Sequence, residues 1–441
     1  MKHSLTESAT LRYESGDPLA QLSQWLPRKA ERGKLLLVDF SLRQYWLPEA
    51  EVLALTAIYY KDAGGSLWVS VTDRALCYSE SGPGQQYAAW AVQHQFARIK
   101  AGEALRLAPT FIPKPWGREI WLTGVEQRGV CKVEGMGEET PIPWLQAAMP
   151  GEDVGACGTP LILLKILDPS AEPVVGDLYF ELHEEKREVY VVTHIDERAW
   201  PDGTGYIRFG FAPKKRALYP REDAFRAAYL DAVRRYEVVR RQLDTIIDEQ
   251  SPPPAAELAS QERQLRGEMD SFTHMKPLRV GDVVKVPLLT PHALQHGVRT
   301  IEFQTPVYER KILSFAQKVL TQDHWDTREG VAQMHLELPE PERFEVVLQE
   351  EGVLVERIVD FSDFEVRRVS LAPGQSLANL VIEQYALIMV VAGQMQLAGS
   401  VYGPEQALLL PRAWQDSLVA AQTASTLVFL LALPRDSAVE S

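Results

Sequence analysis

Residues 177–191 alternate between apolar and polar side chains, and no other stretch restricts the fold of this chain as strongly. Apolar side chains stand at every second position of the first half, so Glu181 and His183 project from the same face of a β-strand. After two further glutamates the alternation resumes, and Lys186 and Glu188 share one face of a returning strand. The pattern predicts a β-hairpin with one apolar face and one face of charged and imidazole side chains.

Two carboxylates and an imidazole on one inward face form a set of metal ligands. Each residue alone is more often a solvated strand residue or a structural histidine, but burying both carboxylates without a cation costs several kcal/mol each. A further ligand is expected later in the chain, where a glycine turn, a short strand and a proline-bounded turn lead to His292. Oxygen donors beside imidazole suit zinc, manganese or iron(II). We therefore expect Glu181, His183, Glu188 and His292 to bind one divalent metal ion, with Zn²⁺ favoured and Mn²⁺ or Fe²⁺ as alternatives.

Length and charge limit the remaining function classes. A chain of 441 residues is long enough for two or three domains. The net charge of −14 argues against nucleic acid or an anionic membrane surface as a partner. Three cysteines without a CxxC pair indicate neither a disulfide framework nor a cysteine zinc site, which favours a reducing, cytoplasmic setting. Because no apolar run is long enough to span a bilayer, we expect no membrane role.

The first part of the chain carries no chemical motif. It combines a helical pattern at residues 49–60 with a strand-like segment at residues 66–71. We expect residues 1–110 to form an α+β N-terminal extension.

Two helices are expected between the hairpin and His292. Apolar residues recur at helical spacing over residues 221–249, which predicts a long amphipathic helix. The prolines at 252–254 end it, and residues 255–269 are expected to form a second, shorter helix.

The stretch from Glu181 to Glu188 and the stretch from Gly281 to His292 together resemble the two motifs of a cupin barrel. The resemblance implies a mainly β chain with two cupin (jelly-roll) barrels. The first, at residues 111–335, would bind the metal and carry the helices as an insertion at about 220–270.

The second barrel is expected at residues 340–435, where the chain again looks all-β. Residues 380–393 and 403–414 resemble a degenerate copy of the two motifs. Its ligand positions hold apolar residues such as Leu380 and Ile382, and no histidine corresponds to the last ligand. We expect this barrel to bind no metal.

Several short motifs resemble those of the type I phosphomannose isomerases, a cupin family. They are Lys114-Pro115-Trp116-Gly117, Lys186-x-Glu188, Pro291-His292-Ala293 and Ile301-Glu302-Phe303-Gln304. The resemblance implies that Lys114 and Trp116 contribute to the substrate site. The family has glutamine at the first ligand position, where this chain has Glu181, so the chain resembles a divergent member. A glutamate there would bind the metal more tightly and make it a weaker Lewis acid.

The resemblance also implies a reaction, the aldose–ketose isomerisation of a sugar phosphate such as mannose 6-phosphate through a cis-enediol. Glu302 is the candidate base that carries a proton between C1 and C2. Lys186 would contact substrate hydroxyls or the enediolate, and Arg310, or alternatively Lys311, would bind the anion. Plainer roles remain open: Glu302 pairs with a neighbouring cation, and Lys186 neutralises the metal-binding carboxylates.

Two other function classes compete with the isomerase. The chain could be a non-catalytic bicupin that binds a sugar or a related metabolite. It could also be an iron(II) oxygenase, which is disfavoured because such an enzyme needs neither Lys186 nor the helical insertion.

Overall fold

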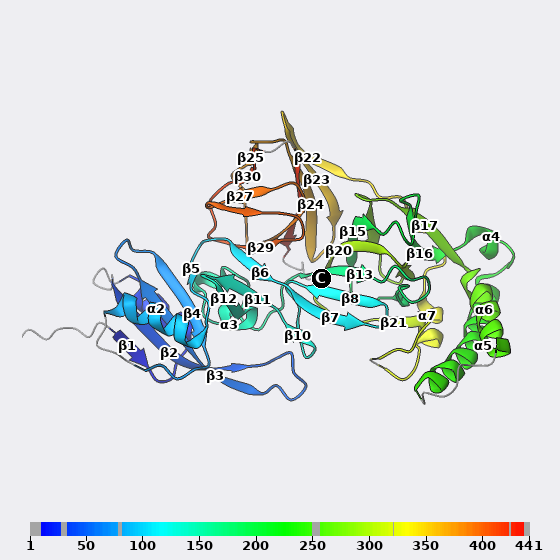
Figure 1. Ribbon diagram of the computed structural model, residues 1–441, viewed down its shortest axis with the longest axis horizontal. Coiled ribbons are helices and arrows are strands. Elements are labelled where there is room, and N and C mark those ends of the chain that lie inside the picture. The colour runs from blue at the N-terminus through cyan, green and yellow to red at the C-terminus, as the bar shows by residue number, and fades with distance from the viewer. Residues whose placement is uncertain are drawn as a thin grey trace, which may run out of the picture. The chain divides into compact units, whose positions relative to one another are not determined.

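The computed structural model of this protein describes residues 10–27, 33–77, 82–248, 256–320, 322–422 and 425–435. Strands predominate over helices, so the predicted mainly β class is confirmed. The chain divides into two compact units, and Figure 1 follows their elements by colour along the sequence. One unit holds residues 1–110, 121–163 and 344–441, and the other holds residues 111–120 and 164–343. The second unit contains every residue assigned above to the metal and substrate site.

Two sheets build the second unit. The first has six strands in the order β18-β15-β20-β13-β8-β7, and the second has five in the order β17-β16-β19-β14-β21. The six strands are β7 (Thr110–Lys114), β8 (Gly117–Trp121), β13 (Leu163–Pro169), β15 (Glu188–Ile195), β18 (Val283–Val286) and β20 (Val298–Gln304). The five strands are β14 (Phe180–Leu182), β16 (Gly205–Phe211), β17 (Thr273–Leu278), β19 (His292–Leu294) and β21 (Lys311–Ser314). One apolar core joins both sheets, with Tyr190 and Val284 from the first and Ile207 and Ile312 from the second.

The predicted hairpin at residues 177–191 is wrong in its pairing. β14 pairs with β19 and β21, whereas β15 pairs with β18 and β20 in the other sheet. The residues between His183 and Glu188 therefore cross from one sheet to the other. The predicted alternation holds, because Phe180 and Leu182 pack on the helical side of β14, away from Glu181. Alternation identifies side chains that share a face, but it does not identify the strand that supplies the hydrogen bonds.

The two helices predicted at residues 221–249 and 255–269 are confirmed. α5 (Glu222–Asp248) and α6 (Ala256–Asp270) lie side by side (Figure 1), and Tyr236 of α5 donates a hydrogen bond to Glu262 of α6. The apolar face of α5 packs with Phe180 and Leu182 on the outer face of the five-stranded sheet. The predicted break at residues 252–254 lies outside the described residues. Two short helices, α4 (Pro213–Arg216) and α7 (Thr327–Gln333), flank this layer.

The first unit contains a small α+β part near the N-terminus. A five-stranded sheet runs in the order β1-β2-β3-β4-β5, and α1 and α2 pack against β2. Its elements are β1 (Thr10–Tyr13), α1 (Pro18–Trp25), β2 (Lys34–Arg43), β3 (Val52–Lys61), β4 (Leu67–Thr72), α2 (Pro83–His94) and β5 (Ile99–Lys100). The strand predicted at residues 66–71 is therefore confirmed as β4.

The helix predicted at residues 49–60 is wrong. This segment forms β3, which pairs with β2 along its whole length and with β4 on its other side. Its middle residues are buried in an unbroken run, a pattern that a central strand and a buried helix share. Pairing with two neighbours decides between them.

The C-terminal segment contains strands but no helix within its described residues. A nine-stranded sheet runs in the order β12-β11-β6-β29-β26-β31-β24-β23-β22, and a four-stranded sheet in the order β25-β30-β27-β28. The nine strands are β6 (Leu105–Ala108), β11 (Lys132–Gly135), β12 (Glu138–Pro141), β22 (Glu345–Glu350), β23 (Val353–Asp360), β24 (Phe364–Leu371), β26 (Tyr385–Ala392), β29 (Ala407–Pro411) and β31 (Leu427–Pro434). The four are β25 (Ser376–Leu377), β27 (Met395–Leu397), β28 (Ser400–Tyr402) and β30 (Leu418–Ala420). The remaining elements of the unit are β9 (Val125–Glu126), β10 (Gly129–Val130), α3 (Ile142–Gln146) and the 3₁₀ turn Pro150–Glu152.

An apolar core joins these two C-terminal sheets. It includes Ile382 and Leu410, and Leu380 packs against it. The division into an extension and two barrels stays a prediction, since β6, β11 and β12 share the nine-stranded sheet with the C-terminal strands.

Within the described residues, no helix has both the length and the apolar character needed to cross a membrane.

Candidate metal centre

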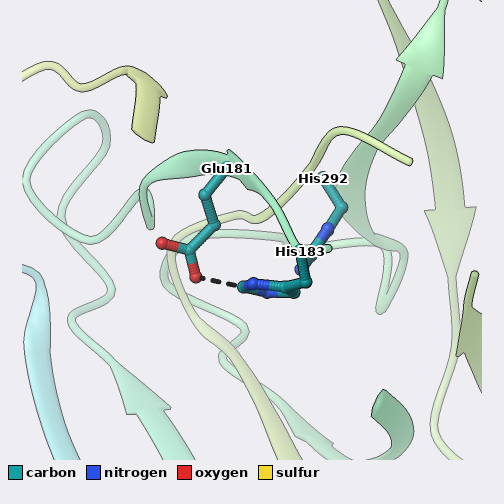
Figure 2. Close-up of side chains that lie close together, drawn as sticks. All are labelled: Glu181, His183 and His292. Atoms are coloured by element: carbon teal, nitrogen blue, oxygen red, sulfur yellow. Dashed lines mark ion pairs between the residues drawn. The ribbon is translucent and has the colours of Figure 1, made fainter. Parts of the chain in front are cut away.

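Strand pairing brings the predicted ligands together. Glu181 in β14 lies directly opposite His292, the first residue of β19. His183 follows β14 by one residue, and Glu188 begins β15 in the other sheet. Figure 2 shows the side chains of Glu181, His183 and His292 pointing toward one another. Each of these three offers a ligand atom within 4.8 Å of the other two.

Glu188 approaches the two histidines from the six-stranded sheet. One carboxylate oxygen lies 3.4 Å from Nε2 of His183, and the other lies 3.1 Å from Nε2 of His292. Nε2 of His183 is also 3.8 Å from the Glu181 carboxylate. The side chains of His183, Glu188 and His292 are almost fully buried, whereas that of Glu181 is 16% exposed. The cluster therefore reaches solvent on the Glu181 side.

Backbone carbonyls orient both imidazoles. Nδ1 of His183 lies 3.0 Å from the carbonyl oxygen of Glu309, and Nδ1 of His292 lies 3.0 Å from that of Thr290. Because a carbonyl oxygen can only accept, the proton of each neutral ring sits on Nδ1. The lone pair of each Nε2 then points into the cluster. A hydrogen bond from the far ring nitrogen to a carbonyl is the usual arrangement around a metal-binding histidine.

The donor set fits a small divalent cation. Nε2 of His183 and one oxygen of Glu181 are buried without a hydrogen-bond partner. Zinc with bonds near 2.1 Å holds tetrahedral ligand atoms about 3.4 Å apart. The separations of 3.1, 3.4 and 3.8 Å in the cluster are close to this value. Two imidazoles and two carboxylates also match the ligand types of zinc, manganese and iron(II). Glu181, His183, Glu188 and His292 can therefore hold one such ion.

Nearby charges keep the ligands in the protonation states that metals require. Burial raises the pKa of Glu188. Lys186, whose Nζ lies 2.7 Å from this carboxylate, and His183 have the larger opposite effect, so the pKa of Glu188 lies well below its usual value. Burial also raises the pKa of Glu181, and Arg310 and His183 bring it below its usual value. Burial and the charge of Lys186 lower the pKa of His183. Ionised carboxylates and a neutral His183 imidazole follow, which is the state that binds a metal.

A row of buried charges crosses the six-stranded sheet beside the cluster. Glu302 in β20 lies opposite Tyr190, whose hydroxyl donates a 2.6 Å hydrogen bond to Glu188. Nζ of Lys165 lies 3.2 Å from Glu302 and 3.8 Å from Glu119. Burial and the charge of Glu188 raise the pKa of Glu302 well above its usual value, although Lys165 opposes this shift. A carboxyl group with a raised pKa can hold and release a proton near neutral pH.

Arg310 and Lys311, the two residues predicted to bind the anion, have different ion-pair partners. The Arg310 guanidinium lies over the ring of Tyr179, with Nε 3.8 Å from Glu181, on the solvent side of the cluster. Lys311 instead pairs with the partly exposed Glu184 at 3.2 Å. Arg310 is therefore the better placed of the two to meet a ligand.

The loop before β8 contributes packing and a buried ion pair. Trp116 is 1% exposed and belongs to the core between the two sheets. Nζ of Lys114 lies 3.1 Å from Glu119, at the far end of the charged row from the metal cluster. The predicted substrate contact of Trp116 does not agree with this position, because the indole is enclosed by core residues. Lys114 holds Glu119 in place.

Sequence reasoning missed the roles of Lys165, Glu119 and Glu309. Lys165 interrupts the apolar run at residues 161–167, a signal that was available in the sequence. No comparable sequence pattern pointed to Glu309. One of its carboxylate oxygens accepts hydrogen bonds from the backbone N–H groups of Glu184 and Glu185 at 2.9 and 3.2 Å, while its carbonyl holds His183. Glu309 thus orders the turn that follows the predicted ligand His183.

The sequence matches no family model and no curated protein. The structure, however, resembles solved structures. The mannose 6-phosphate isomerase from Bacillus subtilis aligns with a TM-score of 0.53 and 14% identity, over 75% of this chain and 99% of that one. The fold resembles that of mannose 6-phosphate isomerase.

Two further mannose 6-phosphate isomerase structures align equally well. One is a zinc-bound mannose 6-phosphate isomerase, and the other is the apo form of the enzyme from Salmonella typhimurium; each gives a TM-score of 0.52 at 14% identity. Each covers 76% of this chain, with 100% and 99% of the respective isomerase aligned. This likeness extends over nearly the whole isomerase chain and concerns the fold.

Proposed function

We propose that this protein is a metal-dependent aldose–ketose isomerase that acts on a sugar phosphate, as mannose 6-phosphate isomerase does. The observation that carries the proposal is the convergence of the Nε2 atoms of His183 and His292 with two carboxylates. The fold supports it, because chains of this fold include mannose 6-phosphate isomerases, one of them zinc-bound.

In this proposal Glu181, His183, Glu188 and His292 hold the metal. A bound divalent cation supplies Lewis acidity for the carbonyl and the adjacent hydroxyl of an open-chain sugar phosphate. Zinc is the favoured ion, because the donor set and one neighbouring structure agree with it.

The proton transfer falls to Glu302. Its raised pKa lets it accept a proton from one carbon and return it to the next through a cis-enediol. Lys165 stays beside it and stabilises the ionised form that accepts the proton. Lys186 contacts the substrate hydroxyls or the enediolate, and Arg310, on the solvent side, binds the phosphate.

A non-catalytic role in binding a sugar or a related metabolite is the second candidate. The observation that favours it is the carboxylate of Glu181, which adds a negative charge where the phosphomannose isomerases carry a neutral glutamine. A more negative ligand set makes the metal a weaker Lewis acid. On this reading the substitution Glu181→Gln weakens metal binding and produces no turnover.

The test is turnover of mannose 6-phosphate and fructose 6-phosphate by zinc-loaded protein. The isomerase proposal predicts interconversion that is lost in His292→Ala, together with the loss of about one equivalent of metal measured by elemental analysis. His324→Ala serves as the matched control, because His324 is 69% exposed and lies in the same unit. Metal binding without turnover in the wild type and in Glu181→Gln supports the binding role. Less than about a tenth of an equivalent after reconstitution contradicts both.

A further inference from the structure

The C-terminal sheets contain a cavity that the proposed isomerase does not use. On the inward face of β23, β24 and β31, the side chains change from apolar to charged along the strands. Val355, Val369 and Phe429 form one apolar row across them, and all three belong to the core. The next rows on the same face hold charged side chains instead.

The first of these rows consists of Arg357 of β23, Arg367 of β24 and Leu431 of β31, which are neighbours across the sheet. In the second row, Glu365 of β24 lies opposite Leu433 of β31. Glu365 is only 4% exposed. A buried ionised group is tolerated only when it is paired, and apolar residues in such places are often at least as stabilising. Charged residues on a core-facing surface therefore indicate a role other than stability.

A cavity of about 520 Å³ lies over these rows. Its apolar wall includes Leu348, Leu377 and Leu431. Its polar lining includes Glu365, Arg367, Arg435, Asn379, Glu383 and Gln384. The loop between β25 and β26, which contains Leu380, closes one side. This volume is within the range of pockets that bind small organic molecules.

The two arginines offer donors to this cavity. Nε of Arg367 and Nη2 of Arg435 each donate a 2.6 Å hydrogen bond to Glu365, which fixes both guanidinium groups. Arg435 also pairs with Asp360. Nη1 of Arg367 has no hydrogen-bond or ion-pair partner among the described residues, and the side chain is 25% exposed. A fixed guanidinium with unused N–H groups is suited to a carboxylate, sulfonate or phosphate oxygen.

We propose that this cavity binds a small organic anion with an apolar body, whose acidic group is held by Arg367 and Arg435. The apolar body lies against Leu348, Leu377 and Leu431. Glu365 does not contact the ligand and acts as a positioning residue for the two arginines. The site is independent of the metal cluster and of the isomerase proposal.

The probe for the test is 8-anilinonaphthalene-1-sulfonate, which joins an aromatic body to a sulfonate. Titration of the full chain, followed by fluorescence and calorimetry, is expected to show one saturable site. N-phenyl-1-naphthylamine, which has the same aromatic body without the sulfonate, is expected to bind at least about tenfold more weakly, since it cannot use the guanidinium groups.

Two variants locate the site. Val381→Trp fills the mouth of the cavity from an exposed position and keeps every ion pair, so binding should fall at least about tenfold. Val401→Trp is the matched control, because Val401 is also exposed but does not line the cavity. Arg367→Ala should weaken binding of the sulfonate probe and leave the affinity for the neutral probe unchanged. Arg367→Lys replaces this variant if the alanine variant fails to fold.

Three results would overturn the proposal. They are equal affinity for the two probes, equal affinity in Val381→Trp and Val401→Trp, and loss of probe binding in His292→Ala. The last would place the probe at the metal cluster instead.

Discussion

Glu309 provides the sharpest test of how the metal site is held. It touches the cluster only through the turn at residues 184–185 and through its own carbonyl to His183. The substitution Glu309→Ala keeps that carbonyl but removes the carboxylate that accepts two backbone N–H groups. A carboxylate that accepts two backbone hydrogen bonds contributes about 1.5–3 kcal/mol when buried, and we take the lower value because the turn is partly exposed.

The same figure sets the expected change in metal affinity. If the metal binds only when the turn is ordered, a loss of about 1.5 kcal/mol in the stability of the turn raises the dissociation constant about tenfold. This agrees with the 10–100-fold effect that is typical of residues supporting a metal ligand. Competition with a chromophoric chelator measures the dissociation constant for zinc, and chemical denaturation measures the free energy of unfolding.

Glu185→Ala is the matched control for this experiment. The Glu185 side chain is exposed, and only its backbone N–H takes part in the turn. Metal affinity should stay within about twofold of the wild type in this variant. Wild-type zinc affinity in Glu309→Ala, with both variants folded, would refute the idea that the carboxylate organises the site.

Two further predictions concern stability. Lys165→Met leaves Glu119 and Glu302 buried without their shared cation, so the free energy of unfolding should fall by about 3–5 kcal/mol. Chemical denaturation of the double variant with Glu302→Gln should show that much of this loss is recovered. No recovery would contradict the shared ion pair. Burial raises the pKa of Asp177, but the His296 hydrogen bonds at 2.7 and 3.0 Å bring it below its usual value. A folded-state pKa below the unfolded one gives stability that is present above the unfolded value of about 3.9 and lost as the pH falls through the folded value. Unfolding free energies between pH 6 and pH 2 should show this loss in the wild type and a smaller one in Asp177→Asn.

Local sequence pattern identified several residues of the candidate metal site. Alternation at residues 177–191 placed Glu181 and His183 on one face, and strand pairing indeed brings Glu181 opposite His292. The long helix α5 was also readable, because helical spacing of apolar residues depends only on the neighbouring turns of the same helix. These features share one property: the information lies within a few residues of the chain.

Features that depend on a distant partner could not be read in the same way. β3 looked like a helix, because its buried run is explained only by β2 and β4 on either side. The crossing between β14 and β15 was mistaken for a hairpin, since a turn of polar residues can lead to either sheet. Lys165 and Glu309 act through contacts with residues far away in the chain.

The sequence by itself determined which side chains share a face and which segments are apolar on one side, since both follow from the geometry of a single strand or helix. Only the tertiary structure decided which faces meet. It brought Glu188 from one sheet to the histidines of the other, and it set Glu365 between two arginines over a cavity. Those contacts depend on the pairing of segments far apart in the chain, which a local pattern does not specify.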